Sequence, residues 1–161
     1  MLALLAIGFF SFGLWVHHMF ATGLPRLGNS FYTAASMAIA IPTGVQIWCW
    51  ITTIWQGRPR YVTPLLFVLG FIVIFVLGGL TGVMVASVPL DLQLHDTYFV
   101  VAHFHYVLIG GGVFPLLGGV YYWFPKITGR LLSEKTGAVE LLAALHRMQA
   151  CGRIDSLRRC P

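Results

Sequence analysis

Four long apolar runs dominate the sequence and restrict the chain to folds that place most side chains in lipid. Each run approaches or exceeds the roughly 20 residues that a helix needs to cross the hydrocarbon core of a bilayer. The runs are Leu2–Phe20, Phe31–Trp55, Val62–Ala86 and Phe99–Phe124. They are continuous, without the alternation of apolar and polar residues that marks the strands of a membrane barrel. The pattern predicts an all-α, polytopic transmembrane helical bundle.

Composition supports a lipid environment. Only 9% of the residues are charged and the mean hydropathy is +0.82, whereas a soluble domain carries about 25% charged residues. The formal net charge of +5 arises mostly near the C-terminus. Between Met1 and Phe124 the charged residues are Arg26, Arg58, Arg60, Asp91 and Asp96. The basic balance therefore does not indicate a nucleic-acid partner.

Charged residues in the short breaks predict the orientation of the spans. Arg58 and Arg60 follow the second run and Lys126 follows the fourth, whereas the break Asp91–Asp96 contains no basic residue. Short basic loops stay on the cytoplasmic side. We therefore expect an integral, multi-pass membrane protein with the Arg26 and Asp91–Asp96 loops facing outward.

The chain changes character after the fourth run. Residues 1–137 form the predicted membrane domain, and residues 138–161 form an atypical tail, interpreted as frameshifted or disordered. Within the tail, Glu140–Met148 predicts a short amphipathic helix. No fifth span is expected.

His103 and His105 lie inside the fourth run, where ionisable residues are costly and indicate function. Helical residues two positions apart point roughly 200° apart, so the pair is poorly placed to bind one ion. Each imidazole can instead ligate a separate flat cofactor, and imidazole is a standard axial ligand of haem iron. The alternative is that each histidine is hydrogen-bonded to a neighbour or to water.

His17 and His18 are adjacent at the outer end of the first run. Neighbouring side chains can converge on one ion where a helix ends, and imidazole suits copper. Two ligands leave such a site incomplete, so a further ligand must come from elsewhere. Two interfacial histidines without a metal are the alternative.

The loop before the fourth run contains His95 and Asp96, which can hold a hard divalent cation or conduct protons. Asp91 lies four residues earlier and reaches the same region if the stretch is helical. The alternative is that Asp96 begins the following helix as its capping residue, and the two roles are compatible.

Four phrases in order carry a resemblance to a known family. They are Trp15–Phe20 (WVHHMF), Ala38–Val45 (AIAIPTGV), Gly78–Gly82 (GGLTG) and His95–Tyr106 (HDTYFVVAHFHY). Residues 1 to about 137 resemble the seventh to tenth transmembrane helices of subunit I of the haem–copper oxidases, a subunit of twelve helices.

The resemblance implies roles for the histidines of the spans. His17 and His18 match two of the three ligands of the active-site copper, copper B. His103 matches the proximal ligand of the high-spin haem, and His105 matches an axial ligand of the low-spin haem. On this resemblance, O2 would bind between the haem iron held by His103 and the copper held by His17 and His18.

The resemblance also implies roles outside these ligands. His95 and Asp96 match a magnesium or manganese site, and Asp91 matches an acid near the haem propionates. Thr43 matches a polar residue of a proton-uptake path. Gln46 stands where the family usually has a lysine, and an amide does not titrate near neutral pH. That path is therefore altered, or the chain belongs to a divergent branch.

Asp96 and Tyr106 stand where ubiquinol oxidases tend to have asparagine, so the chain looks like a cytochrome c oxidase with haems of the a type. The resemblance implies reduction of O2 to water with electrons from cytochrome c, coupled to proton translocation. It implies the rest of subunit I and other oxidase subunits as partners. The alternatives are a ubiquinol-type oxidase, an inactive truncated remnant, and a simple membrane haem protein that uses only His103 and His105.

The family continues beyond residue 137 into helices that this sequence does not contain. The third copper ligand, the tyrosine bonded to it, the glutamate gate and the second low-spin haem ligand do not match any residue here. The isolated chain is therefore expected to lack oxidase activity.

Overall fold

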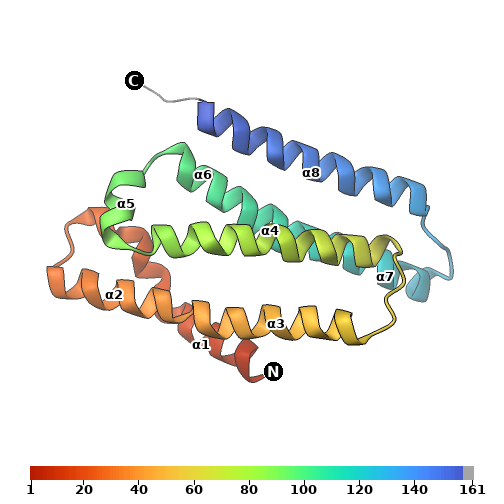
Figure 1. Cartoon of the computed structure of the whole chain (residues 1–161), viewed down its shortest axis with the longest axis horizontal. Coiled ribbons are helices and arrows are strands. Elements are labelled where there is room, and N and C mark those ends of the chain that lie inside the picture. Colours follow the sequence, from red (N-terminus) through yellow and green to blue (C-terminus); the bar gives the residue numbers. More distant parts are fainter. Residues whose placement is uncertain (158–161) are drawn as a thin grey trace. The chain divides into compact units, whose positions relative to one another are not determined.

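The computed structural model describes residues 1–157, with side chains described through residue 149, and this part contains helices and no strands (Figure 1). Four helical segments are long and apolar enough to cross a membrane. They are Leu2–Thr22, Arg26–Gln56, Thr63–Val85 and Tyr98–Thr128. The predicted all-α fold with four spans is confirmed.

The second span begins at Arg26, five residues before the predicted start at Phe31. Its first turn contains the polar residues Asn29 and Ser30, which interrupt the apolar pattern. The backbone is helical there all the same, because the Asn29 amide donates to the Pro25 carbonyl at 3.0 Å. Hydropathy locates the lipid-facing part of a helix, and hydrogen bonding sets its ends.

The chain divides into two compact units, and the first comprises residues 1–58 and 79–97. Its helices are α1 (Leu2–Leu14), the 3₁₀ segment η1 (Trp15–Thr22), α2 (Arg26–Ala38), α3 (Ala40–Gln56), the last turns of α4 (Thr63–Val85), and α5 (Val88–Leu94). α1 packs against α2 and α3, while η1 packs against α2 and α5. The packing therefore gathers η1, α2 and α5 in one region.

Proline explains the break between α2 and α3. Pro42 has no N–H, so the Ala38 carbonyl loses its usual helical partner at the position where α2 ends. The ladder resumes at once, because the Thr43 amide donates to the Ile39 carbonyl at 3.2 Å. The second span is thus one long helical segment with a single local break in its hydrogen bonding, between α2 and α3.

The second unit comprises residues 59–78 and, among those described, 98–157. Its helices are the first turns of α4, then α6 (Tyr98–His105), the π-helical segment η2 (Tyr106–Val113), α7 (Phe114–Thr128) and α8 (Glu134–Leu157). Phe67 of α4 and Phe114 of α7 are both 0% exposed. Their ring centroids lie 6.1 Å apart in an edge-to-face arrangement, which forms the centre of this unit.

Glycines allow η2 and α4 to approach each other closely inside the second unit. A Cβ on Gly110 would overlap the side chain of Ile74, and a Cβ on Gly78 would lie 3.1 Å from Cβ of Tyr106. The turns of η2 thus lie directly against α4. Pro115 follows the π segment and has no N–H to complete an α-helical bond. The wide turns of η2 are consistent with that missing bond.

Glu134 joins the beginning of α8 to the beginning of α4. Its Oε2 accepts hydrogen bonds from the Thr63 amide at 2.7 Å and from the Thr63 hydroxyl. The hydroxyl bond and then the amide bond hold the pKa of Glu134 below its ordinary value of 4.5. The carboxylate therefore satisfies two donors at the first turn of α4, where a helix has no internal acceptors.

The predicted start of the tail, at residue 138, lies inside a helix. α8 begins at Glu134, crosses the predicted boundary and contains the predicted helix Glu140–Met148. Leu141 and Met148 are buried in the second unit. The part of the predicted tail at 158–161 lies outside the described residues.

Replacement of Gly110 by alanine is expected to destabilise the second unit by about 1–3 kcal/mol, because the added methyl group overpacks against Ile74. The matched control is Gly112→Ala in the same π segment, where a Cβ meets nothing within 4 Å. The free energy of unfolding, measured by denaturing-detergent titration in mixed micelles, should fall for the first variant only. Equal changes in the two variants would contradict the close approach.

The Glu134 bonds predict a pH dependence of stability. A folded-state pKa below the unfolded value stabilises the fold above the unfolded value, and this contribution is lost as pH falls through the folded pKa. The wild-type chain should therefore lose stability as pH falls below about 4.5, and Glu134→Gln should show a smaller loss over that range. Glu140→Gln is the control, since it removes another carboxylate of α8 but leaves the Thr63 bonds. The same acid slope in wild type and Glu134→Gln would refute the assignment.

Candidate functional site

His17 and His18 lie in η1, at the end of the first span. Their Nε2 atoms are 3.0 Å apart and their ring centroids 4.2 Å apart. Residues adjacent in a regular helix point about 100° apart. The two rings nevertheless meet at their outer nitrogens, at hydrogen-bonding distance.

The two nitrogens fit one metal ion. An imidazole nitrogen lies about 2.0 Å from a bound transition metal. Two nitrogens 3.0 Å apart, as in His17 and His18, would then subtend about 97° at the ion, since 1.5 divided by 2.0 is the sine of half that angle. That angle suits tetragonal and tetrahedral coordination.

Ser36 is the residue of this site that sequence reasoning missed. It lies in α2, is 4% exposed, and its Oγ is 3.0 Å from Nδ1 of His17. The hydroxyl can donate to Nδ1 or accept from it, so the bond orients the ring without fixing its tautomer. In the tautomer with the proton on Nδ1, Nε2 is left for a metal, as is usual for ligating histidines. Its signal in the sequence was a small polar residue in an apolar helix, and nothing in the sequence related it to His17.

Asp91 and His95 come together at the end of α5. His95 Nδ1 lies 3.6 Å from Asp91 Oδ2, and His95 Nε2 lies 3.7 Å from Asp96 Oδ1. Asp91 is only 5% exposed and its Oδ2 has no hydrogen-bond partner among the described residues. A buried carboxylate oxygen of this kind fits a cation or a donor from another molecule.

The surroundings of Asp91 act on its pKa in opposite directions. Burial raises the pKa of this carboxyl above its ordinary value of 3.8, and the nearby imidazoles of His95 and His18 oppose the increase. Asp91 thus lies within the electrostatic reach of the histidine pair of η1. The first unit therefore gathers the two candidate copper ligands and this acid in one region.

The expectation that Asp96 caps the following helix is wrong. α6 begins at Tyr98, and Asp96 adopts a left-handed conformation with φ of +58°. A capping residue has extended backbone angles instead. Aspartate tolerates the left-handed region better than most residues, and this conformation is uncommon enough to indicate a local constraint.

Thr43 and Gln46 lie three residues apart in α3 and hence on one face of it. The Thr43 hydroxyl donates to the Ile39 carbonyl at 2.8 Å. Gln46 is 8% exposed, so an amide is buried at the position expected to have lost a lysine.

His103 and His105 both lie in α6, which is α-helical throughout, and they belong to the second unit. Nδ1 of His103 donates to the Gly78 carbonyl at 3.1 Å. Nδ1 of His105 donates to the Val101 carbonyl at 2.8 Å. In this tautomer each ring carries its lone pair on Nε2, the arrangement found in histidines that ligate metals.

The geometry of α6 agrees with two separate cofactors. Two positions along an α-helix correspond to roughly 200° of rotation, so His103 and His105 lie on nearly opposite faces. Gly78 has no side chain, so α4 can lie close to α6. The Gly78 carbonyl can therefore reach His103. The residues fit two flat groups ligated from opposite sides of one helix.

The described residues contain no group of three or more His, Cys, Asp or Glu side chains that could hold a metal ion. His17 and His18 supply two nitrogens to one point, and His95 lies between two carboxylates at distances longer than hydrogen bonds. Further ligands are therefore needed for each metal position.

Comparison with known proteins identifies the family. The profile of the family described as "Cytochrome C and Quinol oxidase polypeptide I" matches residues 1–150. The chain is 54% identical to cytochrome c oxidase subunit 1 of Bacillus subtilis over 140 residues, which are 87% of this chain and 22% of that protein. It is 51% identical to the same subunit of Synechocystis over 138 residues, which are 86% of this chain and 25% of that protein.

A third relative shows a similar identity. The chain is 49% identical to cytochrome c oxidase polypeptide 1 of Halobacterium salinarum over 142 residues, which are 88% of this chain and 24% of that protein. It thus spans about a quarter of the length of these relatives. Profile and relatives agree over nearly all of the described residues, and the chain belongs to the haem–copper oxidase subunit I family.

Proposed function

We propose that the chain contributes part of the oxygen-reducing centre of a cytochrome c oxidase. In this proposal the complex reduces O2 to water with electrons from cytochrome c and translocates protons. The observation that carries it is the 3.0 Å approach of Nε2 of His17 to Nε2 of His18. The printed names of the relatives support the choice of cytochrome c as donor.

His17 and His18 are proposed to hold copper B. Copper and the high-spin haem iron, when bound, would bind O2 and pass to it the electrons that cytochrome c delivers. Ser36 keeps the His17 ring in place through Nδ1, so that Nε2 faces the same point as Nε2 of His18. A ring held in advance loses little freedom on binding.

His103 is proposed as the proximal ligand of the high-spin haem and His105 as an axial ligand of the low-spin haem, both of the a type. Bonds to the carbonyls of Gly78 and Val101 hold a proton on each Nδ1 and increase the basicity of each Nε2. Because one short helix positions both rings, the two haems would be close together and on separate faces.

His95 and Asp96 are proposed as ligands of magnesium or manganese, and Asp91 as the acid near the haem propionates. The buried Oδ2 of Asp91 supports a role that involves a partner outside the described residues. An additional oxygen ligand or water would complete the cation site, as Mg²⁺ usually retains several waters.

Thr43 and Gln46 are proposed to line a proton-uptake path along one face of α3. The Gln46 amide can donate and accept hydrogen bonds and so can hold a chain of waters, but it cannot itself carry the proton. The hydroxyl of Thr43 donates to Ile39 and keeps lone pairs that can accept from water.

The protein is proposed to span a bacterial plasma membrane several times, with the Arg58 and Lys126 ends of the spans on the cytoplasmic side. The rest of subunit I and the other oxidase subunits are its proposed partners. Apolar side chains with large exposures, such as Phe12 at 86% and Trp55 at 87%, supply surface for lipid and for these partners.

Ser36→Ala is expected to weaken the affinity of the full chain for Cu(I) about tenfold or more, because the His17 ring loses the bond that orients it. Competition with a chromophoric Cu(I) chelator in detergent micelles measures this affinity. Ser11→Ala is the matched control, since the Ser11 hydroxyl bonds only to the nearby Gly8 carbonyl of α1 in the structure. Equal affinities of the two variants would contradict the role of Ser36.

Haem titration tests whether His103 and His105 serve separate haems. The wild-type chain in micelles should bind two equivalents, and His103→Ala and His105→Ala should each bind one. The double variant should show the sum of both losses, since independent sites are additive. His146→Ala in the exposed part of α8 is the control. If either single substitution abolished all binding, the two histidines would share one haem and the assignment would fail.

A further inference from the structure

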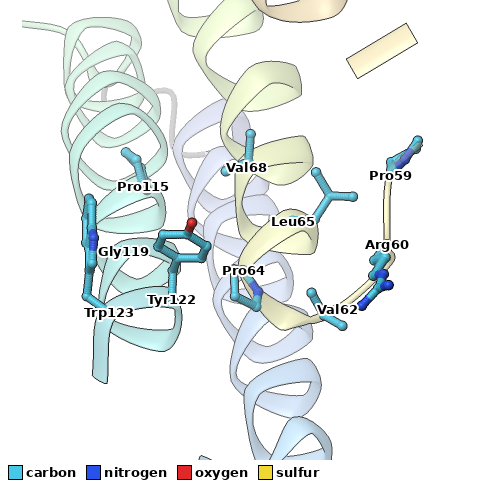
Figure 2. Close-up of a pocket in the computed structure, with 11 residues that line it drawn as sticks. Pro59, Arg60, Val62, Pro64, Leu65, Val68, Pro115, Gly119, Tyr122 and Trp123 are labelled. Carbon is cyan, nitrogen blue, oxygen red and sulfur yellow. The ribbon is translucent and has the colours of Figure 1, made fainter. Parts of the chain in front are cut away.

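Two apolar grooves adjoin on the surface of α7. The first has a volume of about 500 Å³ and lies between the first turns of α4 and the Pro115–Trp123 part of α7, as Figure 2 shows. The second has a volume of about 510 Å³ and lies along α7 itself. Both are lined by Pro115, Gly119 and Trp123, which are four residues apart along the helix. The grooves therefore meet along one row of α7.

Glycines on α7 deepen the grooves. A Cβ on Gly119 would lie 3.0 Å from the Trp123 ring, so the indole lies directly against the backbone of the preceding turn. A Cβ on Gly118 would lie 3.2 Å from Cβ of Phe67, which keeps α7 close to α4. The grooves are thus formed by tight backbone packing.

The first groove has a cationic rim. Arg60 lines it from the loop before α4, and its side chain is exposed. Among the residues whose side chains are described, none forms an ion pair with Arg60. Lys126 lies close by, with Nζ 3.7 Å from the centroid of the Tyr122 ring that also lines the groove.

The rim lies at the end of the spans. α4 begins at Thr63 and α7 ends at Thr128, so Arg60, Lys126 and the aromatic pair Tyr122 and Trp123 lie near the level where hydrocarbon meets headgroups. Tyrosine and tryptophan favour that level. The apolar length of the grooves extends from there along the spans.

We propose that the adjoining grooves bind one anionic phospholipid, with an acyl chain in each groove and the headgroup phosphate beside Arg60. Two grooves that share one row match a ligand with two chains joined at one end. The apolar lining selects hydrocarbon, and the exposed guanidinium selects a negative headgroup, since arginine near a membrane surface attracts anionic lipid and pairs well with phosphate. The Arg60 charge distinguishes this site from general lipid contact.

Photolabelling of the full 161-residue chain in nanodiscs tests the proposal. Phosphatidylglycerol and phosphatidylcholine with a diazirine in one acyl chain are compared at equal mole fraction, and labelled residues are mapped by mass spectrometry. The phosphatidylglycerol probe should label the Pro115–Ile127 stretch about fivefold more than the phosphatidylcholine probe. Arg60→Gln should reduce this ratio to about one, and Arg60→Lys should retain most of it.

Arg58→Gln is the matched control, because Arg58 lies in the same loop but does not line either groove. It should leave the headgroup preference unchanged. Helix content from circular dichroism confirms that each variant is folded. Equal labelling by the two lipids, or equal effects of Arg58→Gln and Arg60→Gln, overturns the proposal. Absence of label from α7 would show that lipid does not enter the grooves, for example because a second copy of the chain covers them, and would overturn the proposal as well.

Discussion

The backbone must satisfy its own hydrogen bonds in hydrocarbon, and the rest of this structure depends on that constraint. Helices meet it within a single segment, which is why four apolar runs become four helical spans. The same constraint makes each interruption informative. Pro42 breaks one ladder and Pro115 follows a change of helix type, and in both places polar or candidate functional residues lie nearby. Irregular backbone inside a membrane is retained where it has a use.

Two pairs of histidines lie in helical segments and are arranged differently. In α6, two positions of separation put His103 and His105 on opposite faces, each bound through Nδ1 to a backbone carbonyl. In η1, a 3₁₀ helix turns about 120° per residue, so the backbone turn alone would separate His17 from His18. Their Nε2 atoms meet because the two rings themselves are turned toward each other.

The sequence predicted the helical class and the four spans, because both depend on local pattern and on apolar length. It did not predict Ser36, whose contact with His17 spans 19 residues. It also misjudged Asp96. Aspartate is a favoured capping residue, but α6 begins only at Tyr98 and the backbone of Asp96 is left-handed. Aspartate tolerates that conformation, and nothing else in the sequence indicates it. Tertiary contacts and backbone handedness set these features, and neither follows from hydropathy.

The π-helical segment η2 begins at Tyr106, directly after the turn that presents His103 and His105. A π turn contains more residues than an α turn, so the angular phase of every side chain in α7 depends on how many residues are wound this way. α6 and α7 are thus parts of one span with independently set rotations. Loss of a single residue from Gly110–Gly112 would rotate the Phe114 face of α7 while leaving the histidine turn where it is. The number of residues wound as π turns therefore sets the rotation of the Phe114 face relative to His103 and His105.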